Sequence, residues 1–147
     1  MRSASDKFNL ANFFRSQLYA SVGVLKIGND ILFKEEGVKV DRITGHGGLF
    51  KTKGVGQRVL AAALDSPISV METAGEGGAW GIALLAKFLV DNPEGLNLED
   101  YLDKKVFAGE KGVEIAPVPE DVEGFNRYIA NYKAGFPIEA AAVKCKQ

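Results

Sequence analysis

The residue types best suited to ligand chemistry gather in a glycine-rich stretch between residues 45 and 52. Three glycines, Gly45, Gly47 and Gly48, fall within four residues, and Lys51 and Thr52 follow shortly after. Because glycine has no Cβ, it allows positive φ and lets a ligand come close to the backbone amide groups. A helix that begins behind such a turn offers N–H donors and a partial positive charge. The stretch therefore predicts a strand, a tight turn and a helix suited to a phosphate or a ribose-phosphate.

The same stretch nearly matches the P-loop pattern, in which a lysine and a hydroxyl residue close a glycine-rich phosphate cradle. Phe50 stands where that pattern requires its second glycine. A phenylalanine disfavours the unusual backbone angles and the close phosphate approach of that position. A P-loop and a plain turn that binds nothing both stay open as alternatives. His46, inside the turn, is expected to face solvent or bond to the backbone, with ligand contact as the alternative.

The size and composition of the chain predict one soluble domain. Its 147 residues are 46% hydrophobic, and no apolar run reaches the roughly 18 residues that a membrane span requires. Its 18 basic and 19 acidic residues nearly balance, so neither nucleic acid nor an anionic membrane is an expected partner. Residues 1–6 are polar and unlike a signal peptide, so the expected location is cytoplasmic.

The scarcity of cysteine and histidine narrows the chemistry further. Cys145 is the single cysteine and His46 the single histidine, which argues against a disulfide, a zinc site and a histidine triad. No metal site built from these residue types is therefore predicted within the chain.

Apolar residues at three-to-four spacing predict a long helix over residues 8–34 with a wide buried face. These residues are Leu10, Phe13, Phe14, Leu18, Val22, Leu25, Ile27, Ile31 and Leu32. Asn9 is the expected N-cap, and Gly37 is expected to end the helix. Gly23 and Gly28 would each cost up to about 1 kcal/mol relative to alanine inside a helix, and glycines kept at that cost often mark close packing against a neighbour or a ligand.

Two strand, turn and helix units follow. Residues 39–45 predict a strand that enters the glycine turn, and residues 54–64 predict a helix that residues 65–67 end with Asp-Ser-Pro. Residues 68–71 predict a second strand, and a second glycine cluster from residue 75 to residue 81 opens into a helix that continues to residue 90.

The helix that follows the second glycine cluster is apolar nearly all round, so it is expected to lie buried between layers. Trp80 is expected to form core or the wall of a pocket. Beyond a stop at residues 91–95, the pattern weakens to a short helix near residues 98–102 and a loop or strand through Val106 and Phe107. A Pro-Val-Pro break then precedes a closing helix that begins at Asp121. Its apolar face is expected to consist of Val122, Phe125, Tyr128, Ile129 and Tyr132.

The order of these elements predicts an α/β fold in which both glycine turns follow strands of a parallel sheet. Both turns would then lie at the carboxyl ends of their strands, on the edge where such sheets bind ligands. The second cluster also loosely resembles a dinucleotide fingerprint, with Gly75, Gly77 and Gly81 after a strand. The acidic residue that should end a further strand is missing, because Asp91 and Glu94 stand in a helix stop.

Four segments in order resemble the C-terminal part of the FGGY carbohydrate kinases, in the actin-like ATPase superfamily. They are residues 12–15 in the first helix, residues 36–48 leading into the glycine pair, residues 58–67 in the next helix, and Glu-Gly-Gly-Ala-Trp-Gly-Ile-Ala at residues 76–83. The resemblance covers residues 8–90 closely and residues 132–139 loosely, and it is xylulokinase- or ribulokinase-like.

The chain departs from the pattern of these kinases at three places. Arg58 stands near the position of their glutamine, Ala61-Ala62 replaces their Ala-Asp, and Tyr19 stands where relatives often carry a glutamate.

The resemblance implies a partial actin-like ATPase (ribonuclease H-like) domain, helix-strand-helix-strand-helix around a short parallel sheet, plus a C-terminal helix. Residues 1–147 would form a single domain and a C-terminal fragment of the kinase, with a nucleotide-binding core at 1–92 and a helical extension at 93–147. The implied cofactors are ATP and Mg²⁺. The implied nucleotide-binding residues are Gly47, Gly48, Leu49, Lys51, Thr52 and Gly77.

The implied function is to hold adenosine and ATP in a kinase that phosphorylates a hydroxyl of a pentulose or related sugar. A missing N-terminal lobe would bind the sugar and supply the aspartate base, so the fragment alone is expected to be inactive. The strand at residues 39–45 would have an unpaired edge, which predicts a homo-oligomer. The competing interpretation is a non-catalytic actin-like ATP-binding or interaction module, and a small P-loop protein is a third.

Overall fold

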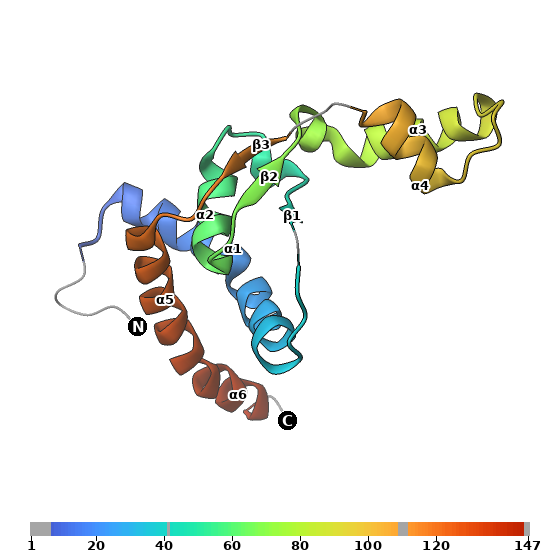
Figure 1. Cartoon of the computed structure of the whole chain (residues 1–147). Helices are drawn as coiled ribbons and strands as arrows, with labels where there is room; N and C mark the ends of the chain where they lie inside the picture. The colour runs from blue at the N-terminus through green and yellow to red at the C-terminus, as the bar shows by residue number, and fades with distance from the viewer. Residues whose placement is uncertain (1–6, 41, 109–111, 146–147) are drawn as a thin grey trace. The chain divides into compact units, whose positions relative to one another are not determined.

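The computed structural model describes residues 7–40, 42–108 and 112–145, and Figure 1 shows their helices and strands. In chain order the elements are α1 (Leu10–Asp30), a π-helical turn (Ile31–Glu35), β1 (Ile43–Thr44), a 3₁₀ turn (Gly48–Phe50), α2 (Val55–Leu64), β2 (Ile68–Val70), a 3₁₀ segment (Glu72–Glu76), α3 (Gly77–Val90), α4 (Leu98–Tyr101), a π-helical turn (Leu102–Val106), β3 (Val113–Ile115), α5 (Pro119–Ala134) and α6 (Phe136–Lys144). These elements confirm the predicted mixture of helices with a small sheet.

The chain divides into two compact units. The first comprises residues 1–41, 58–66 and 116–147, and the second comprises residues 42–57 and 67–115. The single domain over residues 1–147, with its core at 1–92 and its extension at 93–147, stays a prediction.

Aromatic packing between α1 and α5 forms the core of the first unit. The ring of Tyr19 lies 4.8 Å from that of Phe125 and 5.3 Å from that of Tyr128, measured between ring centroids. Phe125 is fully buried, which is consistent with the predicted apolar face of the closing helix. A Cβ at Gly23 would lie 3.6 Å from the side chain of Ile129, so the predicted close packing at Gly23 is confirmed.

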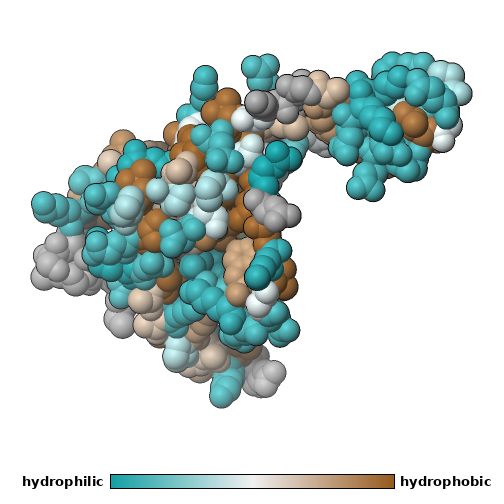
Figure 2. All heavy atoms as spheres, in the orientation of Figure 1, coloured by the Kyte–Doolittle hydropathy of each residue, from teal (hydrophilic) through white to brown (hydrophobic). Residues whose placement is uncertain are grey.

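The wide buried face predicted for α1 is wrong. Val22, Gly23 and Lys26 are its only buried residues in the described part of the chain, whereas Leu10 is 71% exposed and Phe14 is 57% exposed. Apolar side chains accordingly lie at the surface in the space-filling view of Figure 2. The physical reason is that the contacts with α5 cover a narrow strip around Tyr19 and Gly23. Gly28 is not packed against a neighbouring element, because a Cβ there would meet nothing within 4 Å.

Both predicted ends of α1 are confirmed. The side chain of Asn9 accepts a hydrogen bond of 2.8 Å from the N–H of Asn12, as an N-cap should. Beyond Asp30 the backbone widens into the π-helical turn, and Gly37 then takes a φ of +66°. A left-handed residue of this kind ends a helix readily when it is glycine.

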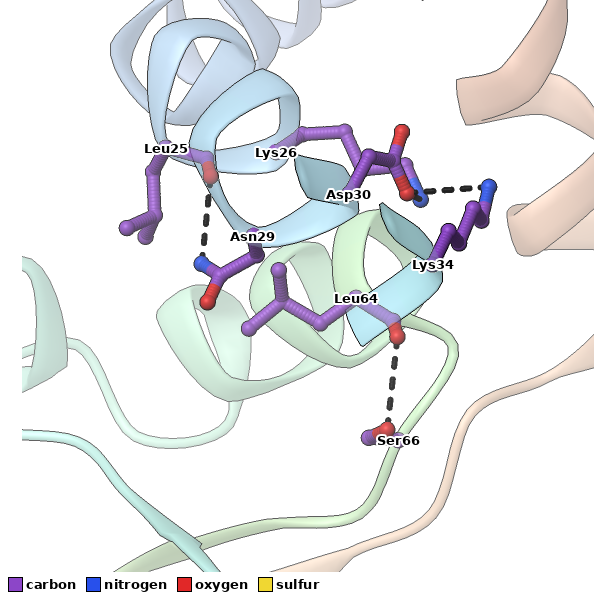
Figure 3. A network of polar contacts seen from close by, with 7 residues as sticks. All are labelled: Leu25, Lys26, Asn29, Asp30, Lys34, Leu64 and Ser66. Atoms are coloured by element: carbon purple, nitrogen blue, oxygen red, sulfur yellow. Dashed lines mark hydrogen bonds and ion pairs between the residues drawn. The ribbon is translucent and has the colours of Figure 1, made fainter. Parts of the chain in front are cut away.

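A buried lysine near the end of α1 is held by a carboxylate one turn away. The ammonium of Lys26 and that of Lys34 each lie 2.9 Å from the same oxygen of Asp30, and Figure 3 shows the three side chains together. Burial alone would raise the pKa of Asp30, but hydrogen bonds from both lysines, and their charges, hold that pKa below its ordinary value. Asp30 therefore remains ionised and neutralises Lys26.

The second unit contains a three-stranded sheet in the order β1-β2-β3. β1 and β2 are parallel, as predicted, and β3 is antiparallel to β2. The strand predicted over residues 39–45 is much shorter than expected. Val38 donates its N–H to the carbonyl of Leu32 and so closes the preceding helical turn instead of joining the sheet.

α2 confirms the helix predicted over residues 54–64, and its last five residues, Leu60 to Leu64, are all buried. It ends where the Asp-Ser-Pro stop predicts, because Asp65 adopts a φ of +50° and Pro67 cannot continue a helix. Pro67 leads directly into β2, whose first residue, Ile68, is fully buried.

The burial predicted for the helix after the second glycine cluster is wrong. None of the side chains described in α3 is buried, and Leu89 is 81% exposed. One side of α3 packs on the following segment, with Trp80 against Phe107 at 5.6 Å and Phe88 against Tyr101 at 5.2 Å between ring centroids. Among the described residues, no element covers the opposite side of α3, so the second packing layer that its apolar sequence predicts is not formed there.

The C-terminal third departs from prediction in detail. Val106 ends a π-helical turn, so the loop or strand predicted there is a helical segment, and the third strand lies later, at β3. A Cβ at Gly112 would lie 2.6 Å from the hydroxyl of Ser69, which shows how closely β3 approaches β2. The closing helix is divided at Gly135 into α5 and α6 (Figure 1). In the part of the chain that the structure describes, no helix is both long and apolar enough to cross a membrane.

Candidate functional site

The two glycine turns meet at the carboxyl ends of β1 and β2, within the second unit. The N–H of Gly45 donates to the carbonyl of Ser69 at 2.8 Å and continues the parallel ladder past β1. Two residues later, the N–H of Gly47 donates to the carbonyl of Ala74 at 2.8 Å. The second bond joins the first turn directly to the second, so the predicted convergence of the two turns on one sheet edge is confirmed.

The Phe50 ring explains why the first glycine is required. A Cβ at Gly45 would lie 2.3 Å from the ring carbon Cζ of Phe50, and Gly45 is buried beneath that ring. Residues 48–50 form a 3₁₀ turn, in which Phe50 and Lys51 donate their N–H groups back to Gly47 and Gly48. Because these amides bond within the turn, they are not the outward-facing cradle of a P-loop, and the structure argues against that alternative.

The middle of the turn combines a strained residue with an open one. Gly47 has a φ of +105° and a ψ of −175°, a conformation open essentially to glycine alone. A Cβ at Gly48 would meet nothing within 4 Å, so the backbone there is accessible. Leu49 instead faces inward, since a Cβ at Gly56 would lie 2.5 Å from its carbonyl oxygen.

Side chains from the first turn lie against the glycines of the second. A Cβ at Gly77 would lie 2.9 Å from Nδ1 of His46, and one at Gly75 would lie 3.2 Å from Cγ of Lys51. His46 is exposed overall, in agreement with the solvent-facing alternative, and it borders Gly77, the first residue of α3. Lys51 and Thr52 are also exposed.

A cavity of about 430 Å³ opens beside the junction of the turns. Its lining is mostly apolar and comes from His46, from the first half of α3 and from the segment after α4. Gly77 is among the lining residues, whereas the other five predicted binding residues, Gly47, Gly48, Leu49, Lys51 and Thr52, are not. The sequence prediction of Trp80 as a pocket wall is confirmed.

Phe107 and Leu102 also line this cavity, and the sequence did not indicate either of them. Spacing could not reveal them, because a π-helical turn between the two residues shifts the periodicity by one position.

The buried side-chain amide of Gln57, which the sequence did not single out, holds two strands of the sheet together. Nε2 of Gln57 donates to the carbonyl of Ile68 at 3.1 Å and to that of Val113 at 2.7 Å. One side chain at the start of α2 therefore ties β2 to β3. Its neighbour Arg58, which was expected to stand near the family's glutamine, instead donates to the carboxylate of Asp121 in α5.

A second cavity, of about 280 Å³, lies where α3 ends. Two ion pairs line it, Lys87 with Asp91 at 2.5 Å and Lys105 with Glu94 at 2.6 Å. The hydrogen bond from Lys87 lowers the pKa of Asp91, so both groups stay charged and neutralise each other. Across the described ranges, no group of three or more His, Cys, Asp or Glu side chains is placed to hold a metal ion.

Comparison with known families identifies the arrangement. In the mixed sheet, the parallel strands β1 and β2 both end in glycine turns beside a cavity, which is the edge where open α/β sheets commonly bind ligands. Residues 1–89, well over half of the chain, match the model of the C-terminal domain of the FGGY family of carbohydrate kinases. The chain belongs to this family. Searches of curated proteins and of solved structures found no match.

Proposed function

We propose that this chain forms the adenosine side of the ATP site in a carbohydrate kinase. In this proposal ATP, with Mg²⁺, donates its γ-phosphoryl group to a hydroxyl of a pentulose or related sugar. The observation that carries the proposal is the bond between Gly47 and Ala74, which brings two glycine turns together beside a cavity. The family match supports the kinase context.

Each proposed binding residue has a role that its surroundings allow. The open backbone at Gly48 receives the ribose and α-phosphate, and the exposed side chains of Lys51 and Thr52 stand on the same turn. Gly47 and Leu49 hold the turn in shape, Gly47 through its left-handed backbone and Leu49 through its contact with Gly56. Gly77 opens α3 at the cavity, where a helix N-terminus favours negative charge.

The chain alone is proposed to bind nucleotide without phosphorylating sugar. The matched model is that of the C-terminal domain. In this proposal the sugar and the catalytic aspartate belong to the other lobe of the kinase. Phosphoryl transfer would then follow closure of the lobes, through positioning and charge neutralisation. Cytoplasmic location and self-association through the edge strand β1 belong to the same proposal.

Titration of the full chain with Mg-ATP tests the proposal, because Trp80 is the single tryptophan and lines the cavity. Binding should change its fluorescence, and Gly48→Asp should weaken that binding at least tenfold by placing a carboxylate where the phosphate lies. Gly28→Asp is the matched control, since this position in α1 also has no neighbour within 4 Å and is not one of the proposed binding residues. Equal ATP affinity of the Gly48→Asp and Gly28→Asp variants would refute the role of the first turn.

A non-catalytic interaction module is the second candidate, favoured by the exposed apolar side of α3. Ile82, Leu89 and Val90 are each more than two-thirds exposed, which suits a surface that another protein covers. A stable partner in the absence of any ATP binding would favour the module over the kinase.

The proposed self-association through β1 has its own test. Light scattering at micromolar concentration measures the mass in solution, and a monomeric mass would refute self-association.

A further inference from the structure

The cavity beside the glycine turns has a wall that offers few ways to read a nucleotide base. Apart from three glycines, the described lining side chains are aliphatic or aromatic, and His46 is the one ionisable side chain among them. A volume of about 430 Å³ lies within the range of ordinary small-molecule sites. Binding in such a cavity must depend mainly on apolar contact and on stacking.

The aromatic part of the wall is fixed by packing. The rings of Trp80 and Phe107 meet at 5.6 Å between centroids and are tilted by 59°, so each supports the other. Stacking of a base on an aromatic ring contributes about 1–3 kcal/mol and tolerates any base, because every base has a π-face. Trp80 therefore contributes affinity without choosing between purines.

His46 does not distinguish adenine from guanine either. A Cβ built at Gly77 would lie 2.9 Å from its Nδ1, so Nδ1 is on the side of Gly77 and we take Nε2 as the nitrogen offered to a ligand. In a neutral imidazole that nitrogen is either a donor or an acceptor, according to the tautomer. It can therefore accept from the exocyclic amino group of adenine or donate to the carbonyl oxygen of guanine.

We infer that this site accepts adenine and guanine nucleotides with similar affinity. The inference rests on the proposed function, and it extends the accepted nucleotides from ATP to guanine nucleotides. Sites that reject a ligand strongly do so by leaving a buried polar group unpaired, whereas apolar walls discriminate by only about 10–200-fold at best. Among the residues that the structure describes, no other side chain of this wall is ionisable, and adenine and guanine present ring systems of the same size. The expected ratio of the ATP and GTP dissociation constants therefore lies at the lower end of that range or below it, within about tenfold.

Parallel calorimetric titrations of the full chain with Mg-ATP and Mg-GTP test the inference, with Trp80 fluorescence as a second readout. Dissociation constants within tenfold, and a fluorescence change with both nucleotides, support it. GTP binding that is more than tenfold weaker, alongside normal ATP binding, overturns the inference and leaves the proposed function intact. Binding of neither nucleotide overturns both.

Variants locate the effect in the cavity. Phe107→Ala should weaken both nucleotides by a similar factor, about tenfold, because it removes the support of Trp80. Leu89→Ala is the matched control, since Leu89 lies on the same helix, is 81% exposed and is not a lining residue. A Phe107→Ala effect on one nucleotide only would contradict the inference, because it would show that the wall distinguishes the bases.

Discussion

α2 and α3 each follow a strand of the same parallel pair, yet they differ in how far their side chains are buried. α2 buries five consecutive residues, Leu60 to Leu64, and is tied to the sheet through Gln57. α3 is the more apolar sequence, but none of its described side chains is buried, and its cover comes from the aromatic contacts of Trp80 and Phe88. Apolar content therefore does not determine burial here. The contacts that each helix makes with its neighbours do.

The sharpest test of this contrast is one truncation made in both helices. Leu60→Ala should lower the free energy of unfolding by about 3 kcal/mol, because it leaves a cavity at a side chain that is 6% exposed. Leu89→Ala, at 81% exposure, should change it by less than about 0.5 kcal/mol. Urea unfolding followed by circular dichroism measures both. Equal losses would abolish the distinction between the two helices.

Adding one methyl group should destabilise the protein at the start of α2 but not at an open position. Gly56→Ala would place a Cβ 2.5 Å from the carbonyl oxygen of Leu49, and backbone must move to relieve that contact. We expect a loss of about 2.5 kcal/mol, within the usual range for overpacking. Gly28→Ala is the matched control, because its Cβ would meet nothing within 4 Å. A thermal midpoint unchanged in Gly56→Ala would contradict the tight fit.

The buried amide of Gln57 gives the next largest effect. Gln57→Leu keeps a similar volume but leaves the carbonyl groups of Ile68 and Val113 without this donor. The expected loss is about 2 kcal/mol, the cost of burying polar groups unpaired. Amide hydrogen exchange should rise in β2 and β3 together. Faster exchange confined to α2 would show that the bridge is not what holds the strands.

The smallest effect should have the opposite sign. Gly81→Ala in α3 adds a methyl group with no neighbour within 4 Å, and alanine favours a helix by up to about 1 kcal/mol over glycine. A gain of roughly 0.5–1 kcal/mol in denaturant unfolding is expected. A loss of stability would indicate that α3 is packed more closely than the contact distances show.

The sequence predicted best those features whose cause is local. The N-cap at Asn9, the stop at Asp65 and the left-handed Gly37 all depend on neighbouring residues, and each is confirmed. The joining of the two glycine turns also followed from strand order alone, since parallel strands end at one edge.

Features that depend on distant partners were missed. The apolar stripe of α1 predicted a broad core, but the aromatic cluster with Tyr19 covers only part of it. β3 was not found because three residues after a glycine carry too short a pattern to identify a strand, and its pairing with β2 is set by contacts with Ser69 and Gln57. Gln57 itself looks like an ordinary polar helix residue until the strands that it joins are known.

The π-helical turn after α4 makes the length of this segment critical. Phe107 donates its N–H to the carbonyl of Leu102, five residues back, so the turn holds one residue more than an α-helical turn would. Deleting a single residue between them would rotate the Phe107 side chain by about 100° and carry it away from Trp80. Substitutions in this turn should therefore be tolerated far better than deletions of one residue. The number of residues between Leu102 and Phe107 should matter more than their identity.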